Sequence, residues 1–206
     1  TPWTIPFNLA VMVNPELEYV RAKVGNETWI VAKGLVNILM GALGKSYKIS
    51  GEFKGTELEG VEYKPPFWDE LEILHILKGK HKWMFKVILS EEYVDLSAGS
   101  GLVHCAPGCG PEDQEVGKKY GLPAFNELNE LGEFSAKVGK FAGWIAKKDD
   151  AKFIKDLEKN GSLLMSTKVE HEYPHCWRCK EPVVFRATEQ WFMKVEDLKK
   201  KMQDLN

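Results

Sequence analysis

The sequence lacks any apolar run that approaches the roughly 18 residues of a membrane-spanning helix, and residues 1–3 do not resemble the basic start of a signal peptide. It also lacks an excess of charge of either sign, because 28 Lys and Arg residues stand against 30 Asp and Glu residues. A broad basic face for duplex nucleic acid is therefore not expected, and any contact with RNA should be local. We expect a cytoplasmic protein that makes no membrane contact.

Cysteine is scarce as well, with four thiols in 206 residues. This number is too small for a disulfide scaffold in a domain of this size, so we expect reduced thiols. The chain contains neither an internal repeat nor a low-complexity linker, and 44% of its residues are hydrophobic. These features predict a single domain over residues 1–206 with a buried core, and we expect a monomer.

The hydrophobic periodicity predicts a β-rich chain of the α+β class. A hairpin should turn at Gly25 and Asn26, and one helix should end at Gly44. Strands are further predicted over 7–13, 47–61, 82–96 and 169–192, and helices over 147–161 and from Val195 onward. Because glycines interrupt the strand pattern over 47–61, the expected architecture is a curved, mostly antiparallel β-barrel flanked by helices.

The stretch GALGKS, from Gly41 to Ser46, ends like a phosphate-binding loop. That loop motif needs a glycine where Leu39 stands, and it begins a helix, whereas this stretch closes one. A plain helix end is the favoured interpretation.

The run GSGLVHCAPGCGPEDQEVGKKYGLP, from Gly99 to Pro123, is the most unusual part of the chain. It predicts a strand, a glycine loop and a helix that begins at Pro111 and ends at Gly121. Free backbone N–H groups at the start of such a helix could receive an anion or a carbonyl oxygen.

Two side chains of this run are candidate functional groups. A carboxylate at Asp113 would repel phosphate, so the site suits an ammonium group beside a neutral carbonyl, unless Asp113 only satisfies the helix dipole. His104 ends an apolar strand and would by default be a hydrogen-bonded core histidine, but the nearby glycines make it a functional candidate. Cys105 should point away from His104 on a strand, so a metal site built on this pair is not favoured.

The segment HCWRC contains a cysteine knuckle, Cys176 and Cys179. Two thiolates separated by two residues can chelate one tetrahedral zinc ion, with His171 or His175 as possible further ligands. Four ligands are needed, so the pair predicts half of a zinc site, and the alternative is two buried free thiols.

Four segments of the chain together resemble one known family, the editing (CP1) domain of isoleucyl-tRNA synthetases in the class I group. They are similar to that family's threonine-rich opening motif, an internal marker, its Gly-x-Gly-x-Val-His-x-Ala-Pro motif and its exit segment. The segments are TPWTIPFNLAV at 1–11, YKPPF at 63–67, the glycine run at 99–123 and YPHCWRCKEPVVFRATEQWF at 173–192. The valyl and leucyl editing domains carry other residues around the His-x-Ala-Pro position, so the isoleucyl resemblance is favoured.

The resemblance implies hydrolysis of valine wrongly esterified to isoleucine tRNA, and of valyl-adenylate, with isoleucine excluded. A missing methylene supplies only about 1–3 kcal/mol of discrimination, a limit for which these synthetases are themselves the standard example. The implied partners are the 3′ end of the tRNA and the catalytic core, which the exit segment over 171–206 would reach. No cofactor is implied for editing, and ATP-binding signatures are absent from this sequence.

The resemblance also implies roles for particular residues. Asp113 would bind the α-ammonium of the substrate, His104 would lie against the amino-acid side chain and the terminal ribose, and Thr1 would position the water or the ester carbonyl. The implied substrate-binding residues are Trp3, Thr4, Gly99, Gly101, Asp113 and Tyr173. Trp3 and Tyr173 would line the pocket or receive the terminal adenosine of the tRNA.

The resemblance has further implications for the zinc site, for the start of the chain and for Cys109. Cys176 and Cys179 would form half of a structural zinc site that residues outside this chain complete. The family motif carries further threonines before Thr1, so we expect the isolated chain to bind its substrate but to hydrolyse it poorly. Cys109 stands where relatives commonly have His or Phe. The alternatives are a valyl- or leucyl-type editing domain, a non-catalytic zinc-knuckle RNA-binding module and an inserted domain without activity.

Overall fold

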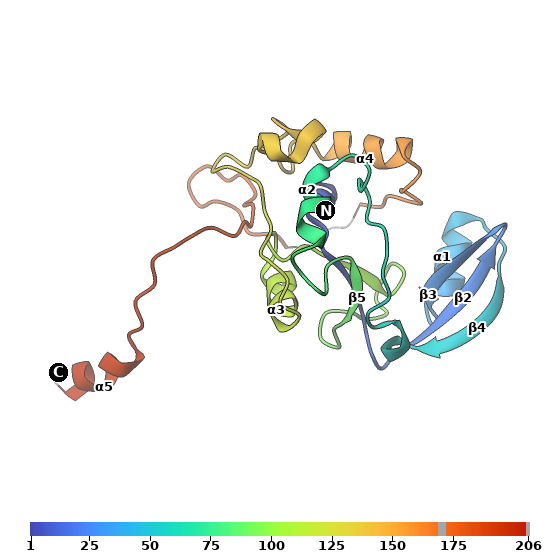
Figure 1. Cartoon of the computed structure of the whole chain (residues 1–206), viewed down its shortest axis with the longest axis horizontal. Helices are drawn as coiled ribbons and strands as arrows, with labels where there is room; N and C mark the ends of the chain where they lie inside the picture. Colours follow the sequence, from blue (N-terminus) through green and yellow to red (C-terminus); the bar gives the residue numbers. More distant parts are fainter. Residues whose placement is uncertain (169–171, 205–206) are drawn as a thin grey trace.

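The computed structural model of the protein describes residues 1–168 and 172–204. Within these ranges the strands form two three-stranded sheets, with the helices around them (Figure 1). No helix in the described residues is long and apolar enough to cross a membrane. The strands are β1 (Ala10–Val13), β2 (Glu18–Val24), β3 (Glu27–Ala32), β4 (Lys48–Lys54), β5 (Lys86–Leu89) and β6 (Leu102–Cys105). The α-helices are α1 (Val36–Leu43), α2 (Glu72–Lys78), α3 (Pro111–Lys119), α4 (Asp150–Lys159) and α5 (Glu196–Asp204), and the 3-10 helices are η1 (Pro2–Phe7), η2 (Gly55–Leu58) and η3 (Ala136–Phe141).

The sheet β3-β2-β4 forms, with α1, a lobe at one side of the molecule (Figure 1). The predicted hairpin is confirmed, because β2 and β3 pair in antiparallel register across a turn in which Gly25 has φ 59°. The predicted helix end is confirmed too, since Gly44 adopts the left-handed conformation with φ 61°. Local turn residues therefore set where the hairpin turns and where α1 ends.

The second sheet, β5-β1-β6, has a different set of apolar residues on each face. β1 is central, parallel to β5 and antiparallel to β6. Because side chains alternate along a strand, Met12 and Cys105 pack into the main core on one face, while Val13 packs against the lobe's core on the other. His104 lies on the face opposite Cys105, as predicted.

Most pairings are antiparallel and the α+β class is confirmed, whereas several boundaries differ from the predictions. The strand predicted over 7–13 begins only at Ala10, because Pro2 and Pro6 favour the 3-10 turn that precedes it. The strand predicted over 47–61 ends at Lys54, where η2 follows. Helix α2, which is seven residues long, was not predicted.

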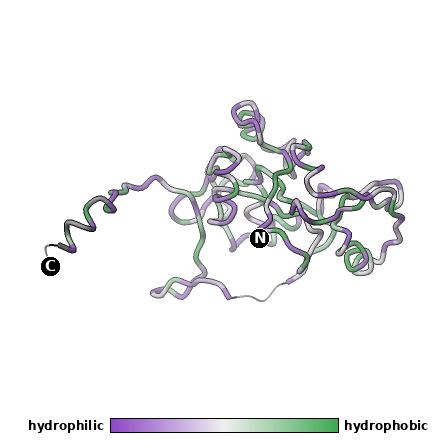
Figure 2. Tube along the Cα trace, turned by 90° about the horizontal axis from the view of Figure 1, so that it is seen from below, coloured by the Kyte–Doolittle hydropathy of each residue, from purple (hydrophilic) through white to green (hydrophobic). Residues whose placement is uncertain are grey.

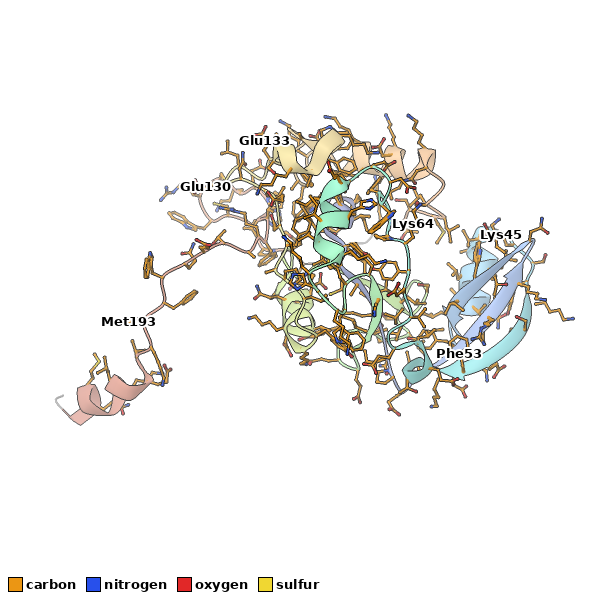
Figure 3. The ribbon with its side chains drawn as sticks, viewed as in Figure 1. Lys45, Phe53, Lys64, Glu130, Glu133 and Met193 are labelled. Carbon is orange, nitrogen blue, oxygen red and sulfur yellow. The ribbon has the colours of Figure 1, made fainter. Side chains whose placement is uncertain are left out.

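The C-terminal segment differs most from its prediction. In residues 172–192 the predicted strand is wrong apart from one bridge between His175 and Pro182, because no neighbouring strand lies alongside to accept its hydrogen bonds. The predicted helix near the C-terminus is confirmed as α5, which lies apart from the body in two views (Figures 1 and 2). The side chains of Trp191 and Phe192 are 103% and 90% exposed, and Met193 lies on the same extended stretch (Figure 3).

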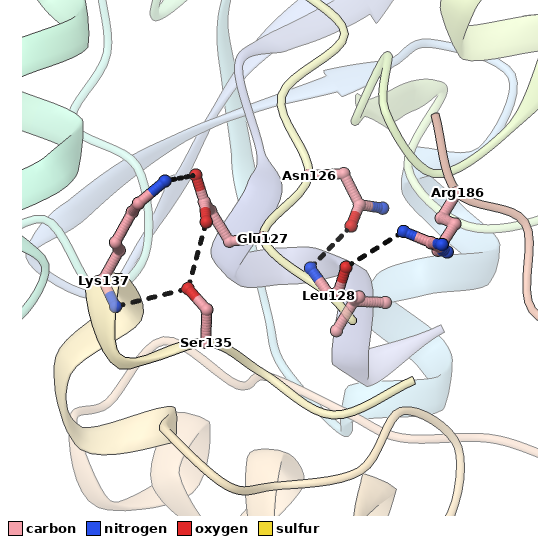
Figure 4. A network of polar contacts seen from close by, with 6 residues as sticks. All are labelled: Asn126, Glu127, Leu128, Ser135, Lys137 and Arg186. Atoms are coloured by element: carbon pink, nitrogen blue, oxygen red, sulfur yellow. Dashed lines mark hydrogen bonds and ion pairs between the residues drawn. The ribbon is translucent and has the colours of Figure 1, made fainter. Parts of the chain in front are cut away.

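The C-terminal segment nevertheless contacts the body before it extends away. The Arg186 Nη1 atom donates to the Leu128 carbonyl at 3.2 Å (Figure 4). The Ala187 backbone N–H donates to the Gly108 carbonyl at 3.0 Å. These contacts place the segment beside the glycine loop.

Candidate functional site

An apolar cavity of about 290 Å³ lies on the face of sheet β5-β1-β6 that carries His104. Strand alternation places Val11, Leu102 and His104 on this face, so β1 and β6 form the floor. Residues that precede β1 and the segment 63–66 form the walls. The complete lining is Ile5, Asn8, Val11, Tyr63, Pro66, Leu102 and His104. A cavity of this size and polarity suits a small apolar group.

Hydrogen bonds determine which nitrogen of His104 carries the proton. The Asn8 Nδ2 group donates to the Ala10 carbonyl at 2.9 Å, and this contact orients the amide. The same group lies 2.8 Å from His104 Nδ1, which must therefore accept. The ring proton is left on Nε2, 3.1 Å from Thr4 Oγ1.

Thr4 continues this chain of hydrogen bonds toward the start of the sequence. Its hydroxyl donates to the Thr1 carbonyl at 2.8 Å and can therefore accept from His104 Nε2. Burial lowers the pKa of His104 to about 4, so the ring is neutral at physiological pH. Both ring nitrogens have hydrogen-bond partners, so the ring is held in place and His104 lines the cavity without acting as a general base.

Asn8 and Tyr63 are site residues for which sequence reasoning assigned no role. The Tyr63 hydroxyl donates to Asn8 Oδ1, and burial raises the pKa of that hydroxyl. The Tyr63 backbone N–H donates to the Phe85 carbonyl at 3.0 Å, which holds this residue beside β5. A polar Asn8 inside an otherwise apolar run and the YKPPF marker were the available signals.

Asp113 lies in the first turn of α3 and does not line the cavity. Its Oδ2 atom accepts from the Ala106 backbone N–H at 3.0 Å. Burial raises the pKa of the carboxyl group, and the Ala106 hydrogen bond opposes this shift only in part. A partly buried carboxylate with little charge compensation is a suitable partner for a cation.

The structure joins Thr1, Thr4 and His104 by hydrogen bonds, whereas the side chains of Trp3 and Tyr173 have other partners. Trp3 is buried in the main core, and its backbone N–H bonds to Asp150. Tyr173 lies near the knuckle, where its hydroxyl donates to the Val183 carbonyl at 3.1 Å and the Lys147 Nζ atom lies 3.4 Å from its ring centroid.

The two predicted glycines share a φ of 75° but differ in surroundings. Gly99 is exposed, and a Cβ atom added there would meet nothing within 4 Å. A Cβ atom on Gly101 would lie 2.3 Å from the Cβ atom of Ala32, at the junction between the sheets. Gly101 therefore has a packing reason to be glycine.

The knuckle residues Cys176 and Cys179 lie close together in a turn. Hydrogen bonds from the backbone N–H groups of Cys179 and Arg178, and from the Cys179 thiol, lower the pKa of Cys176. The thiolate is the form that binds zinc, so a lowered pKa favours zinc binding by Cys176. The described residues contain no group of three or more metal-binding side chains, and His171 lies outside them.

Comparisons with known proteins match the chain to one portion of much longer enzymes. It is 46% identical over 206 residues to isoleucine–tRNA ligase of Pyrococcus abyssi, which covers 98% of this chain and 19% of that protein. It is 43% identical over 204 residues to the isoleucine–tRNA ligase of Kosmotoga olearia, with 98% and 21% covered. The chain therefore spans about a fifth of the length of these relatives. No protein-family model matches.

A solved structure supports the same assignment at the level of the fold. The CP1 domain of a leucyl-tRNA synthetase, GlLeuRS-CP1, superimposes with a TM-score of 0.60 over 82% of each chain, at 17% sequence identity. The chain therefore belongs to the isoleucine–tRNA ligase family, as a segment that has the fold of a CP1 editing domain.

Proposed function

We propose that this segment edits the products of an isoleucine–tRNA ligase, by hydrolysing valine esterified to isoleucine tRNA, and valyl-adenylate as a second substrate. The observation that carries the proposal is the small apolar cavity walled by a neutral, doubly hydrogen-bonded His104. The relationship to isoleucine–tRNA ligases supports it.

Selection against isoleucine rests on the rigidity of the cavity wall. Val11 and Leu102 offer apolar contacts to a short aliphatic side chain. One more methylene would require the His104 ring to move, although hydrogen bonds hold both of its nitrogens. Overpacking of this kind costs about 1–3 kcal/mol. Isoleucine is therefore excluded by a steric clash, and not by the loss of a favourable contact.

The reaction needs positioning more than a strong nucleophile, because an amino ester is already activated. Asp113 would bind the α-ammonium group, whose positive charge compensates a carboxylate that burial disfavours. The exposed Thr1 would position the attacking water or the ester carbonyl. His104 would hold the side chain and the terminal ribose in place without accepting a proton.

The C-terminal segment has a proposed connecting role. Residues 172–204 would lead back to the catalytic core, and Tyr173 would stack on the terminal adenosine of the tRNA. Cys176 and Cys179 would hold two positions of a structural zinc ion, which other parts of the longer enzyme would complete. The hydrogen bonds to Cys176 fit this donor role.

The proposal is tested by deacylation of isoleucine tRNA charged with valine or with isoleucine. The chain is assayed as it stands and with threonines added before Thr1. We expect the valyl ester to be hydrolysed about 100-fold faster, because about 3 kcal/mol of overpacking corresponds to that ratio. Equal rates would contradict size exclusion, and failure of both chains to hydrolyse either ester would refute the editing function.

Replacing Tyr63 with phenylalanine should weaken discrimination against isoleucine about 10-fold. The variant loses one hydrogen bond, whose net contribution is about 0.5–1.5 kcal/mol, and about 1.4 kcal/mol corresponds to a tenfold change in the ratio of rates. The change keeps the ring but removes one of the two hydrogen bonds that orient Asn8, so the partner of His104 Nδ1 is held less firmly. The ratio of the two deacylation rates is the measurement. The matched control is Tyr47→Phe, which deletes a hydroxyl bonded to Asn37 in the lobe. Equal ratios in both variants would show that Tyr63 does not hold the wall.

A further inference from the structure

The lobe formed by β2, β3, β4 and α1 separates its charges between two faces. Residues 18–54 contain six Lys or Arg residues and three Glu residues, although the whole chain has a net charge of −2. Strand register places all three glutamates, Glu18, Glu27 and Glu52, on the face that also carries Val20 and Val24. This face packs against α1 in the lobe's core.

The glutamates are already engaged by neighbouring groups. Lys33 Nζ lies 3.1 Å from Glu18 and 2.6 Å from Glu52. Glu27 accepts from Trp29 Nε1 at 2.7 Å. None of these three carboxylates is therefore free to neutralise positive charges on the opposite face of the sheet.

That opposite face carries Arg21, Lys23 and Lys48, and we call it the cationic face. All three side chains are exposed, and none forms an ion pair within the part of the chain that the structure describes. Lys23 and Lys48 are direct cross-strand partners. Like charges in this position destabilise a sheet, so the pair is unfavourable for the free protein.

Arg21 is held in a defined position on this face. Its guanidinium carbon lies 4.6 Å from the ring centroid of Phe53, which stands at the base of the lobe (Figure 3). Gly51 lies opposite it in the register, and a Cβ atom there would lie 3.4 Å from the Arg21 Nη1 atom. A guanidinium that is stacked on an aromatic ring is arranged to receive a planar or tetrahedral anion.

From this arrangement we propose that the cationic face binds the phosphate backbone of the substrate tRNA, and this inference rests on the proposed function for the identity of the RNA. Charge complementarity selects the occupant, because an RNA backbone supplies repeated anions across adjacent strands. The face adjoins the site, because Tyr19 lies on the same face of β2 as Arg21 and its hydroxyl donates at 2.8 Å to the carbonyl of Gly101, the residue before Leu102 of the cavity lining. A local contact of this kind needs no net positive charge on the whole chain.

The test measures binding of uncharged isoleucine tRNA to the full chain at several salt concentrations. The double variant Lys23→Gln/Lys48→Gln should bind about 10-fold more weakly at low salt, and its slope of log affinity against log salt should fall by about 2, or one per lysine. Its melting temperature without RNA should equal or exceed that of the parent, because the like-charge contact is removed. The matched control is Lys155→Gln/Lys159→Gln, which removes two exposed charges from α4 and should leave binding unchanged.

Unchanged affinity and salt slope in the lobe variant would overturn the inference, as would an equal loss in the α4 control. Deacylation separates this inference from the proposed function. Hydrolysis of valyl-tRNA with no effect of the lobe variant on binding would leave editing intact and reject the cationic face. Weaker binding by the lobe variant, together with no hydrolysis by the chain either with or without added threonines, would reject editing and support the cationic face.

Discussion

Replacing Asp113 with asparagine should lower kcat/KM for valyl-tRNA deacylation about 100-fold. The loss of a charged partner that is largely removed from water typically costs about 2–5 kcal/mol, and every 1.4 kcal/mol is about tenfold. The asparagine side chain can still accept from the Ala106 backbone N–H, so the geometry at the start of α3 is kept. The difference therefore reports the charge.

The same substitution should not destabilise the free protein. Burial raises the pKa of Asp113 in the folded chain, which means that its negative charge opposes folding above its unfolded pKa. A neutral amide removes this cost, so the melting temperature at pH 7 should equal or exceed that of the parent. Activity and stability are thus expected to change in opposite directions.

Glu112→Gln is the matched control for Asp113. Glu112 is also in the first turn of α3, but its side chain is exposed. Both substitutions weaken the interaction with the helix dipole, and only Asp113→Asn removes the proposed ammonium partner. Similar small losses in both variants would show that Asp113 serves the dipole alone.

Replacing Gly101 with alanine should destabilise the fold by about 2–5 kcal/mol. The left-handed backbone costs a residue with a Cβ atom about 1–2 kcal/mol, and overpacking adds about 1–3 kcal/mol. The clash is specific, because the new methyl group would lie 2.3 Å from the Ala32 Cβ atom. The Tyr19 hydroxyl donates to the Gly101 carbonyl at 2.8 Å, so a shift of this backbone would also disturb the junction between the sheets.

Gly99→Ala is the comparison that isolates the clash. Gly99 has the same φ of 75°, but nothing lies within 4 Å of its added Cβ atom. Denaturant unfolding should therefore show a loss of about 1–2 kcal/mol for this variant, from the backbone conformation alone. Equal losses at the two positions would contradict a packing role for Gly101. A selective loss of deacylation in Gly99→Ala would favour a substrate contact at Gly99.

The predictions that succeeded depend on short-range physics. Gly25 and Gly44 adopt positive φ angles that end local elements, and Pro111 begins α3 because its fixed φ suits a first helical position. The alternation of side chains along β6 correctly predicted that His104 and Cys105 lie on opposite faces of the sheet. Each of these features depends on residues within a few positions of one another.

The site itself could be predicted only in part. The resemblance to editing domains selected Thr4 and His104, which do form a hydrogen bond. It included Tyr63 in the YKPPF marker but gave it no role, and the contact of Tyr63 with Asn8 spans 55 residues. A hydrogen bond between residues this distant in sequence leaves no periodic signal, so only the folded chain could show that Tyr63 and Asn8 are partners.

The sequence by itself determined the class of the fold, the hairpin and helix ends, and the resemblance to an isoleucyl editing domain, since each follows from local patterns or motifs. The tertiary structure decided the rest. The antiparallel pairing of β1 with β6 forms the cavity floor that carries His104, and the register of β2 with β4 brings Lys23 opposite Lys48. Strand pairing joins residues that are far apart in the chain, and burial then sets the pKa values of His104 and Asp113, so neither the site's protonation nor its surface charge could be determined before folding.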